Sequence, residues 1–185
     1  MARRSTSIDL RELALSTGHR VERVLDVDIA PIVFGGQSYQ VVVGAQGVRV
    51  TVDRVSGGFL VRLSFDASVY GPCFRCLNEA SLAVQAKQEE FVPLHPEEWG
   101  PGDVSPFVDD LVVDVEALAR EALILALPGK ILCSDGCPGV CPSCGREAHE
   151  GPCEGAVDET DPRWACLRNL DLPPEDTSSL KTDGE

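Results

Sequence analysis

Eight cysteines carry most of the chemistry that this sequence of 185 residues could support. One CxxC pair stands alone in the first half, and five thiols follow in a short cluster in the second half. These seven are Cys73, Cys76, Cys133, Cys137, Cys141, Cys144 and Cys153. A CxxC turn aims two thiolates at one ion, and four such ligands make a tetrahedral zinc site. The spacing therefore predicts a metal-binding module.

Disulfide bonds are the main alternative use for so many cysteines. The N-terminal MARRSTSIDLREL has arginines but no apolar stretch behind them, and no run of about 18 apolar residues occurs anywhere. We therefore expect a protein of the reducing cytoplasm with no membrane contact, where thiols bind metals rather than pair.

The net charge of −14 is unevenly distributed. Residues 1–88 carry 10 Lys or Arg against 8 Asp or Glu, whereas residues 89–185 carry 6 against 22. The acidic second half would repel phosphate backbones. Direct RNA contacts are therefore expected from the first half, and a basic protein partner would suit the second.

Apolar residues alternate with polar ones in several segments between residues 20 and 90, as expected of antiparallel strands. Examples are 48–52, 59–65 and 82–86, with a Ser-Gly-Gly turn at 56–58 between the first two. One strong helix follows at 115–127, with Asp114 as N-cap and Pro128 at its end. The fold class predicted is α+β: an antiparallel β-meander or partial barrel packed with one main helix, plus a small C-terminal zinc-binding module.

Four regions follow from these patterns. Residues 1–17 are expected to be a flexible N-terminus or short helix, and 18–128 a β-rich domain with its covering helix. Residues 129–170 should form the cysteine-rich zinc module and a short helix, and 171–185 a disordered tail.

The pair Cys73–Cys76 is expected at a hairpin tip between two strands. A redox CxxC usually owes its reactive thiol to a helix N-terminus, which this position lacks. Metal ligation suits the tip better than dithiol chemistry or a buried structural pair.

Four features occur in a fixed order along the chain: a CxRCL pair after a β-rich half, a helix ending in LALP, the run LCxxxCPGVCPxCG, and a closing DPRWACLRNL. Together they resemble the YceD family of bacterial proteins over roughly residues 8–170. The resemblance implies a role in the accumulation of large-subunit ribosomal RNA. One departure is that many members look like they end the cluster with CxC, whereas Cys153 precedes Glu154 and Gly155.

The thiols can be grouped in two ways. His149 could replace the missing thiol, so that Cys141, Cys144, His149 and Cys153 form one site and Cys73, Cys76, Cys133 and Cys137 form another. The competing arrangement is a single site from Cys137, Cys141, Cys144 and Cys153, with Cys133 left over. Cys166 is expected to be a small buried hydrophobe. Two structural zinc ions are predicted, although four thiolates would also accept iron.

Three classes of function remain open. The favoured one is a non-catalytic ribosome-biogenesis factor for accumulation or processing of large-subunit (23S) ribosomal RNA. It would contact the rRNA precursor or a basic ribosomal protein, and no small-molecule substrate is expected. The possible RNA-facing residues are Arg49, Arg54, Arg62 and Arg75. The other classes are a thiol oxidoreductase using Cys73 and Cys76, and a metal-stabilised transcriptional or chaperone-like adaptor.

Overall fold

The computed structural model describes residues 6–100, 102–141, 144–146, 148, 153 and 163. The chain divides into two compact units, residues 1–140 and 141–185. The domain boundary at residue 128 stays a prediction from the sequence, while residues 129–140 belong to the first compact unit. All the helices and strands described belong to the first unit.

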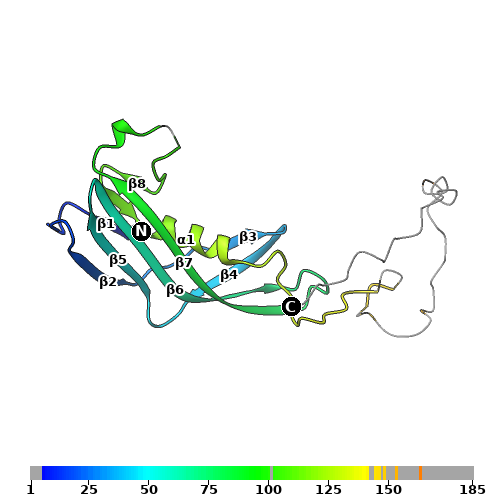
Figure 1. The fold of residues 1–185 in the computed structure, drawn as a ribbon. Coiled ribbons are helices and arrows are strands. Elements are labelled where there is room, and N and C mark those ends of the chain that lie inside the picture. The colour runs from blue at the N-terminus through cyan, green and yellow to red at the C-terminus, as the bar shows by residue number, and fades with distance from the viewer. Residues whose placement is uncertain are drawn as a thin grey trace, which may run out of the picture. The chain divides into compact units, whose positions relative to one another are not determined.

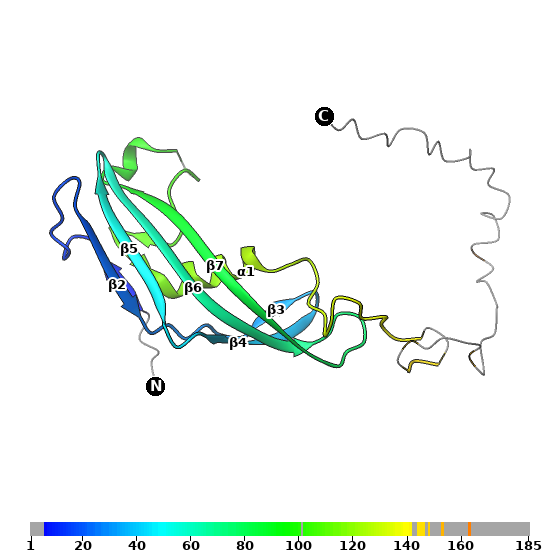
Figure 2. The same cartoon turned by 60° about the horizontal axis from the view of Figure 1, so that its bottom comes forward.

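A six-stranded antiparallel sheet forms the body of this unit (Figure 1). Its strands are β2 (Arg20–Leu25), β3 (Ile32–Phe34), β4 (Gln37–Val43), β5 (Val48–Val55), β6 (Gly58–Pro72) and β7 (Glu79–Pro93). They are ordered β2-β5-β6-β4-β3, and β7 also pairs with β6. Figure 2 shows β2, β5, β6 and β7 side by side, with β3 and β4 toward the other end of the long strands.

Strand β6 organises the sheet because it is 15 residues long, about twice the length of β5. β7 pairs with β6 along its whole length. The opposite edge of β6 is shared: β5 pairs with residues 58–64 and β4 with residues 67–70. The predicted meander is thus present as β5-β6-β7, but β4 pairs with the second half of β6 and not with β5. Within the described residues β2 and β3 have one partner each, so the sheet is open and not a closed barrel.

A second, three-stranded sheet has the order β1-β9-β8. These strands are β1 (Ser7–Asp9), β8 (Val108–Asp109) and β9 (Val112–Asp114), and a short 3₁₀ helix, η1 (Pro96–Glu98), precedes them. β1 lies where the sequence suggested a flexible segment or a short helix. Its pairing partner β9 is some 100 positions away, with Ile8 opposite Val113, so local sequence could not show it.

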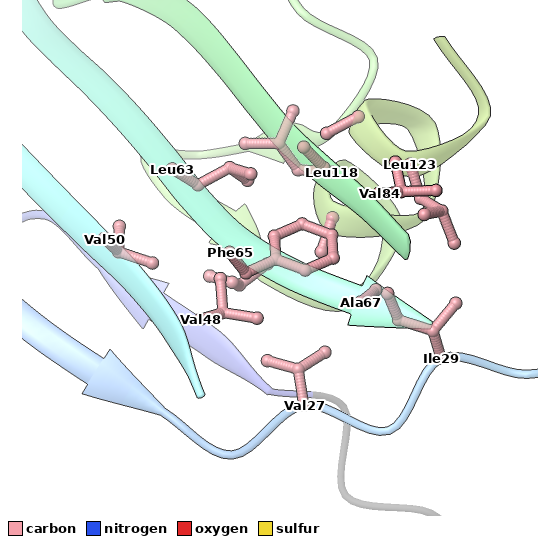
Figure 3. Packing of buried hydrophobic residues seen from close by; sticks show 14 of the residues in the cluster. Val27, Ile29, Val48, Val50, Leu63, Phe65, Ala67, Val84, Leu118 and Leu123 are labelled. Carbon is pink, nitrogen blue, oxygen red and sulfur yellow. The ribbon is translucent and has the colours of Figure 1, made fainter. Parts of the chain in front are cut away.

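The single α-helix described, α1 (Val115–Ala126), begins at Asp114, whose side chain accepts a hydrogen bond of 3.0 Å from the Ala117 N–H. Its apolar face is buried and packs against the sheet, where Leu118 and Leu123 lie near Phe65 and Val84 (Figure 3). The predicted α+β class with one main helix is confirmed. No helix in the described part of the chain is long and apolar enough to cross a membrane.

Candidate metal centre

The loop between β6 and β7 holds the first CxxC pair, Cys73 and Cys76. The Cys73 N–H donates to the Asn78 carbonyl at 2.7 Å, and the Leu77 N–H donates to the Cys73 carbonyl at 3.0 Å. Leu77 adopts a left-handed conformation with φ of 64°. These bonds fold six residues into a tight tip, which is the hairpin knuckle that the sequence predicts.

After α1 the chain returns to this tip. The Phe74 N–H donates to the carbonyl of the buried Ile131 at 2.8 Å. The Arg75 guanidinium donates to the Cys137 carbonyl at 2.7 Å. These two contacts bring Cys133 and Cys137 to the hairpin tip.

The four thiols of this first cluster lie close together. The sulfur atoms of Cys73 and Cys137 are 3.7 Å apart and those of Cys76 and Cys133 are 3.6 Å apart. All four sulfurs lie within 4.8 Å of one another. A tetrahedral zinc ion with four thiolates places its sulfurs about 3.8 Å apart, whereas a disulfide needs about 2.05 Å. The cluster therefore has the geometry of a four-thiolate metal site and not of two disulfides.

The thiols of this cluster differ in exposure and in proton affinity. Cys73 and Cys137 are buried, Cys76 is half-buried and Cys133 is exposed. Burial disfavours the Cys73 thiolate, but backbone N–H groups, including that of Arg75, outweigh it and lower the pKa of Cys73 to about 6. This thiol is therefore ready to bind a cation near neutral pH.

Cys76 is shifted in the opposite direction. The backbone at Asn78 favours its thiolate, but burial and the neighbouring thiols, Cys133 first among them, raise the pKa of Cys76 to about 12. Closely spaced thiols cannot all ionise without a positive charge between them. A divalent cation would supply that charge, so the donor set fits a metal ion.

A second cluster is formed in the second unit by Cys141, Cys144 and Cys153, whose sulfurs also lie within 4.8 Å of one another. Hydrogen bonding from Cys144, together with burial, raises the pKa of Cys153 to about 11. Two backbone bonds close the loop: the Cys141 N–H donates to the Arg146 carbonyl at 2.7 Å, and the Gly145 N–H donates to the Cys141 carbonyl at 2.8 Å.

The two CxxC loops share one backbone pattern. In each, the first Cys donates its N–H to the carbonyl five residues on and accepts the N–H four residues on. The residue at that fourth position is left-handed in both, Leu77 with φ of 64° and Gly145 with φ of 70°. Aligning CFRCLN with CPSCGR could have indicated this equivalence from the sequence.

The described thiols fall into two clusters, and the two-site ligand sets stay a prediction from the sequence. Cys137 lies with Cys73, Cys76 and Cys133 in the first cluster. Both clusters could bind metal ions. Two further residues of the sequence prediction, His149 and Cys166, lie outside the described residues.

The four arginines considered for RNA contact do not share one face. Arg49 and Arg62 lie on the outer face of the sheet, opposite to the buried row of β5 and β6. Arg54 lies on the other face. Its guanidinium donates to the Gly58 carbonyl at 2.7 Å, and the guanidinium carbon lies 4.9 Å from the centre of the Phe59 ring. Arg75 lies in the knuckle.

Ion pairs already engage the two outer-face arginines to different extents. Arg62 contacts both Asp53 and Glu89. Arg49 has one long contact of 3.5 Å to Glu22, and both side chains are more than half exposed. Arg49 is therefore the more available of the two for an external anion.

Comparison with known proteins relates this chain to several bacterial sequences. A protein described as uncharacterised from Mycobacterium tuberculosis is 33% identical over 129 residues, which is 68% of this chain and 62% of that protein. A Mycobacterium leprae protein, also uncharacterised, is 29% identical over 72% of this chain and 62% of its own length. The uncharacterised Bacillus subtilis protein YlbN is 27% identical over 66% of this chain and 76% of its own. The chain thus matches less than two thirds of the length of the mycobacterial relatives.

No solved structure matches the chain significantly. A family model described as "Large ribosomal RNA subunit accumulation protein YceD" matches residues 61–171, more than half of the chain. The matched segment begins in β6 and contains both thiol clusters, from Cys73 to Cys153. The chain belongs to the YceD family.

Proposed function

We propose that this protein is a non-catalytic ribosome-biogenesis factor that supports the accumulation or processing of large-subunit (23S) ribosomal RNA and is stabilised by zinc. The observation that carries the proposal is the family match over residues 61–171, because that segment includes both thiol clusters. The family's description supplies the process. The closed thiol geometry supports a structural part for the metal.

The first zinc ion would be held by Cys73, Cys76, Cys133 and Cys137, and its bonds would join the β6–β7 knuckle to the segment after α1. Four protein ligands leave no position for a substrate water, which favours a structural over a catalytic ion. Structural zinc contributes about 10–16 kcal/mol of apparent binding free energy in small modules. Such an ion would order the tip, whose two large apolar side chains, Phe74 and Leu77, are exposed and contribute little burial.

The second ion would be held by Cys141, Cys144 and Cys153, with His149 as the fourth ligand. Three of these residues come from the described cluster and His149 from the sequence spacing. Cobalt substitution tests this set, since replacing His149 by Cys would convert an S₃N absorption spectrum into an S₄ spectrum at the second site alone. An unchanged spectrum would remove His149 from the ligand set.

A dithiol oxidoreductase is disfavoured by the position of Cys73. An attacking thiol must reach its substrate disulfide. Cys73 is fully buried and faces Cys137. Assay of disulfide reduction by the zinc-loaded protein should therefore give no activity above that of a Cys73→Ser variant.

The function itself is tested by native pull-down of a tagged, chromosomally expressed protein at moderate salt, with sequencing of bound RNA and identification of bound proteins. We expect enrichment of large-subunit rRNA precursor or of basic ribosomal proteins from the cytoplasm. A Cys73→Ser/Cys137→Ser variant, expected to lose the first ion, provides the matched control. Recovery of polymerase subunits without either ribosomal component would overturn the proposal and favour an adaptor function.

A further inference from the structure

A row of three residues crosses the outer face of the main sheet. Arg49 of β5 lies opposite Ser64 of β6, and Ser64 lies opposite Lys87 of β7. Adjacent strands are about 4.8 Å apart, so the backbones at Arg49 and Lys87 lie about 10 Å apart with the small Ser64 side chain between them. Both cationic side chains are exposed. This spacing leaves room for one anionic group above Ser64.

The charges beside this row are already paired. Asp53 accepts hydrogen bonds from Arg20 and from Arg62, and Arg62 also contacts Glu89. These ion pairs run across β2, β5, β6 and β7, and their two positive charges balance their two negative charges. Lys87, in contrast, has no ion pair within the described part of the chain.

A shallow hollow lies over the row. Its volume is about 250 Å³, and its polar lining includes Arg49, Ser64, Asp66, Gln85 and Lys87. A second hollow of about 510 Å³ shares Ser64 and Lys87 with it and continues toward Thr51 and Arg62. The row therefore lies at the junction of two hollows and not on a flat sheet surface.

The lining combines cations with acceptors. Arg49 and Lys87 can donate to phosphate oxygens, as a guanidinium and an ammonium commonly do. The Asp66 carboxylate is an acceptor, and it would repel a bare phosphate while accepting a hydrogen bond from a hydroxyl. Gln85, opposite Asp66 in the ladder, offers an amide that donates and accepts. A ligand for this hollow needs an anionic group and a hydroxyl donor a few ångströms apart.

A ribonucleotide has both groups, its phosphate and its 2′-hydroxyl. We infer that this hollow binds a nucleotide of single-stranded RNA, with its phosphate between Arg49 and Lys87 and its 2′-hydroxyl on Asp66. The inference rests on the proposed function, which it deepens by locating the RNA contact on the sheet. The RNA contact inferred here is one small site and not a broad basic surface formed by Arg49, Arg54, Arg62 and Arg75.

The charge balance of the face sets the expected strength of binding. The four outer-face cations Arg20, Arg49, Arg62 and Lys87 are matched by Glu22, Asp53, Asp66 and Glu89. A site that holds one phosphate between two cations makes about one phosphate contact, so the logarithm of affinity should fall with the logarithm of salt with a slope of about −0.7.

The test uses the zinc-loaded full chain and a labelled single-stranded RNA oligonucleotide, with fluorescence anisotropy measured over a salt series. Lys87→Glu and Arg49→Glu should each weaken binding by about tenfold or more, because each removes a charge-assisted contact. The matched control is Arg23→Glu, which makes the same charge change on β2 but lies opposite Val50, in the row of the other face. It should leave affinity nearly unchanged.

Asp66→Ala gives a second readout. The variant should lower the preference for RNA over DNA of the same sequence, because alanine offers no acceptor for the 2′-hydroxyl. Equal losses in Lys87→Glu and Arg23→Glu, or no RNA binding by the wild-type chain, would overturn the inference. If the Lys87→Glu protein still recovers rRNA precursor from cells as the wild type does, this site is wrong while the proposed function stands.

Discussion

The sulfur atoms of Cys73 and Cys137 lie 3.7 Å apart although the two residues are separated by 64 positions in the chain. Cys73 directly follows the long strand β6, and Cys137 follows the helix that packs on the sheet. A metal ion bound between them would therefore join the hairpin tip to the segment after α1. Such an ion would stabilise the architecture of the first unit and not only a local loop.

The first prediction concerns the metal content of a ligand variant. Cys137→Ala should lower the zinc content from two ions per chain to one, because the second cluster uses other thiols. It should also lower the midpoint of thermal unfolding, since the knuckle loses its link to the segment after α1. Metal analysis and calorimetry of the purified protein measure both effects.

Cys166→Ser is the control for this experiment, and it should retain both ions. A ratio of one zinc in the wild type, unchanged in Cys137→Ala, would contradict the two-site arrangement.

The second prediction concerns the left-handed residue of the knuckle. Leu77 has φ of 64° and is 63% exposed, so its side chain contributes little burial to offset the strained backbone. Leu77→Gly should raise the free energy of unfolding by about 0.5–1 kcal/mol. This is the energy that a left-handed backbone costs a non-glycine residue, minus the extra conformational entropy that glycine gives the unfolded chain. Denaturant unfolding of the zinc-loaded protein checks this. Leu77→Ala keeps the strain and should give no gain; equal gains for Ala and Gly would rule out the backbone explanation.

The third prediction concerns the close approach of β4 and β6 near the knuckle. Tyr39 is buried, donates its hydroxyl to the Pro72 carbonyl at 2.9 Å, and its ring occupies the space that a Cβ on Gly71 would need. Gly71→Ala should cost about 1–3 kcal/mol of unfolding free energy by overpacking. Gly129→Ala, where an added Cβ meets no atom within 4 Å, should change stability little. Similar losses in both variants would show that the replacement of glycine itself, and not the Tyr39 ring, sets the cost.

The fourth prediction concerns pH. The Arg20 guanidinium, which hydrogen-bonds to the carboxylate, holds the pKa of Asp53 below its usual range, and Arg62 adds to the effect. Because the folded pKa is the lower one, the stabilisation is complete above the unfolded value of about 3.9 and is lost as pH falls through the folded value. Asp53→Asn should therefore lower the unfolding free energy by about 1 kcal/mol at pH 7, with the difference vanishing in acid.

Unfolding titrations of wild type and Asp53→Asn at several pH values measure this difference. Glu22→Gln removes a longer and more exposed pair with Arg49 and should have a smaller effect. A difference that is constant with pH would show that the loss comes from packing and not from charge.

Several elements could be predicted from the sequence because their causes are local. The alternation of Val48, Val50 and Val52 predicts a strand with one buried face, and β5 is that strand. Asp114 followed by apolar residues at helical spacing predicts the start of α1 and its buried face. The sequence could also have shown that Arg49 and Arg54 lie on opposite faces of the sheet, because they are an odd number of positions apart in one strand.

The remainder depends on contacts between distant segments. The sequence by itself determined the fold class, the hairpin turn, the helix and the CxxC pairs, since each arises from residues within a few positions of one another. Only the tertiary structure decided that β4 pairs with the second half of β6, and that Cys133 and Cys137 meet Cys73 and Cys76. Those outcomes follow from the length of β6, whose edge opposite β7 pairs with two strands. They also follow from the return of the chain after α1 to the tip, where the Ile131 carbonyl accepts a hydrogen bond from the Phe74 N–H.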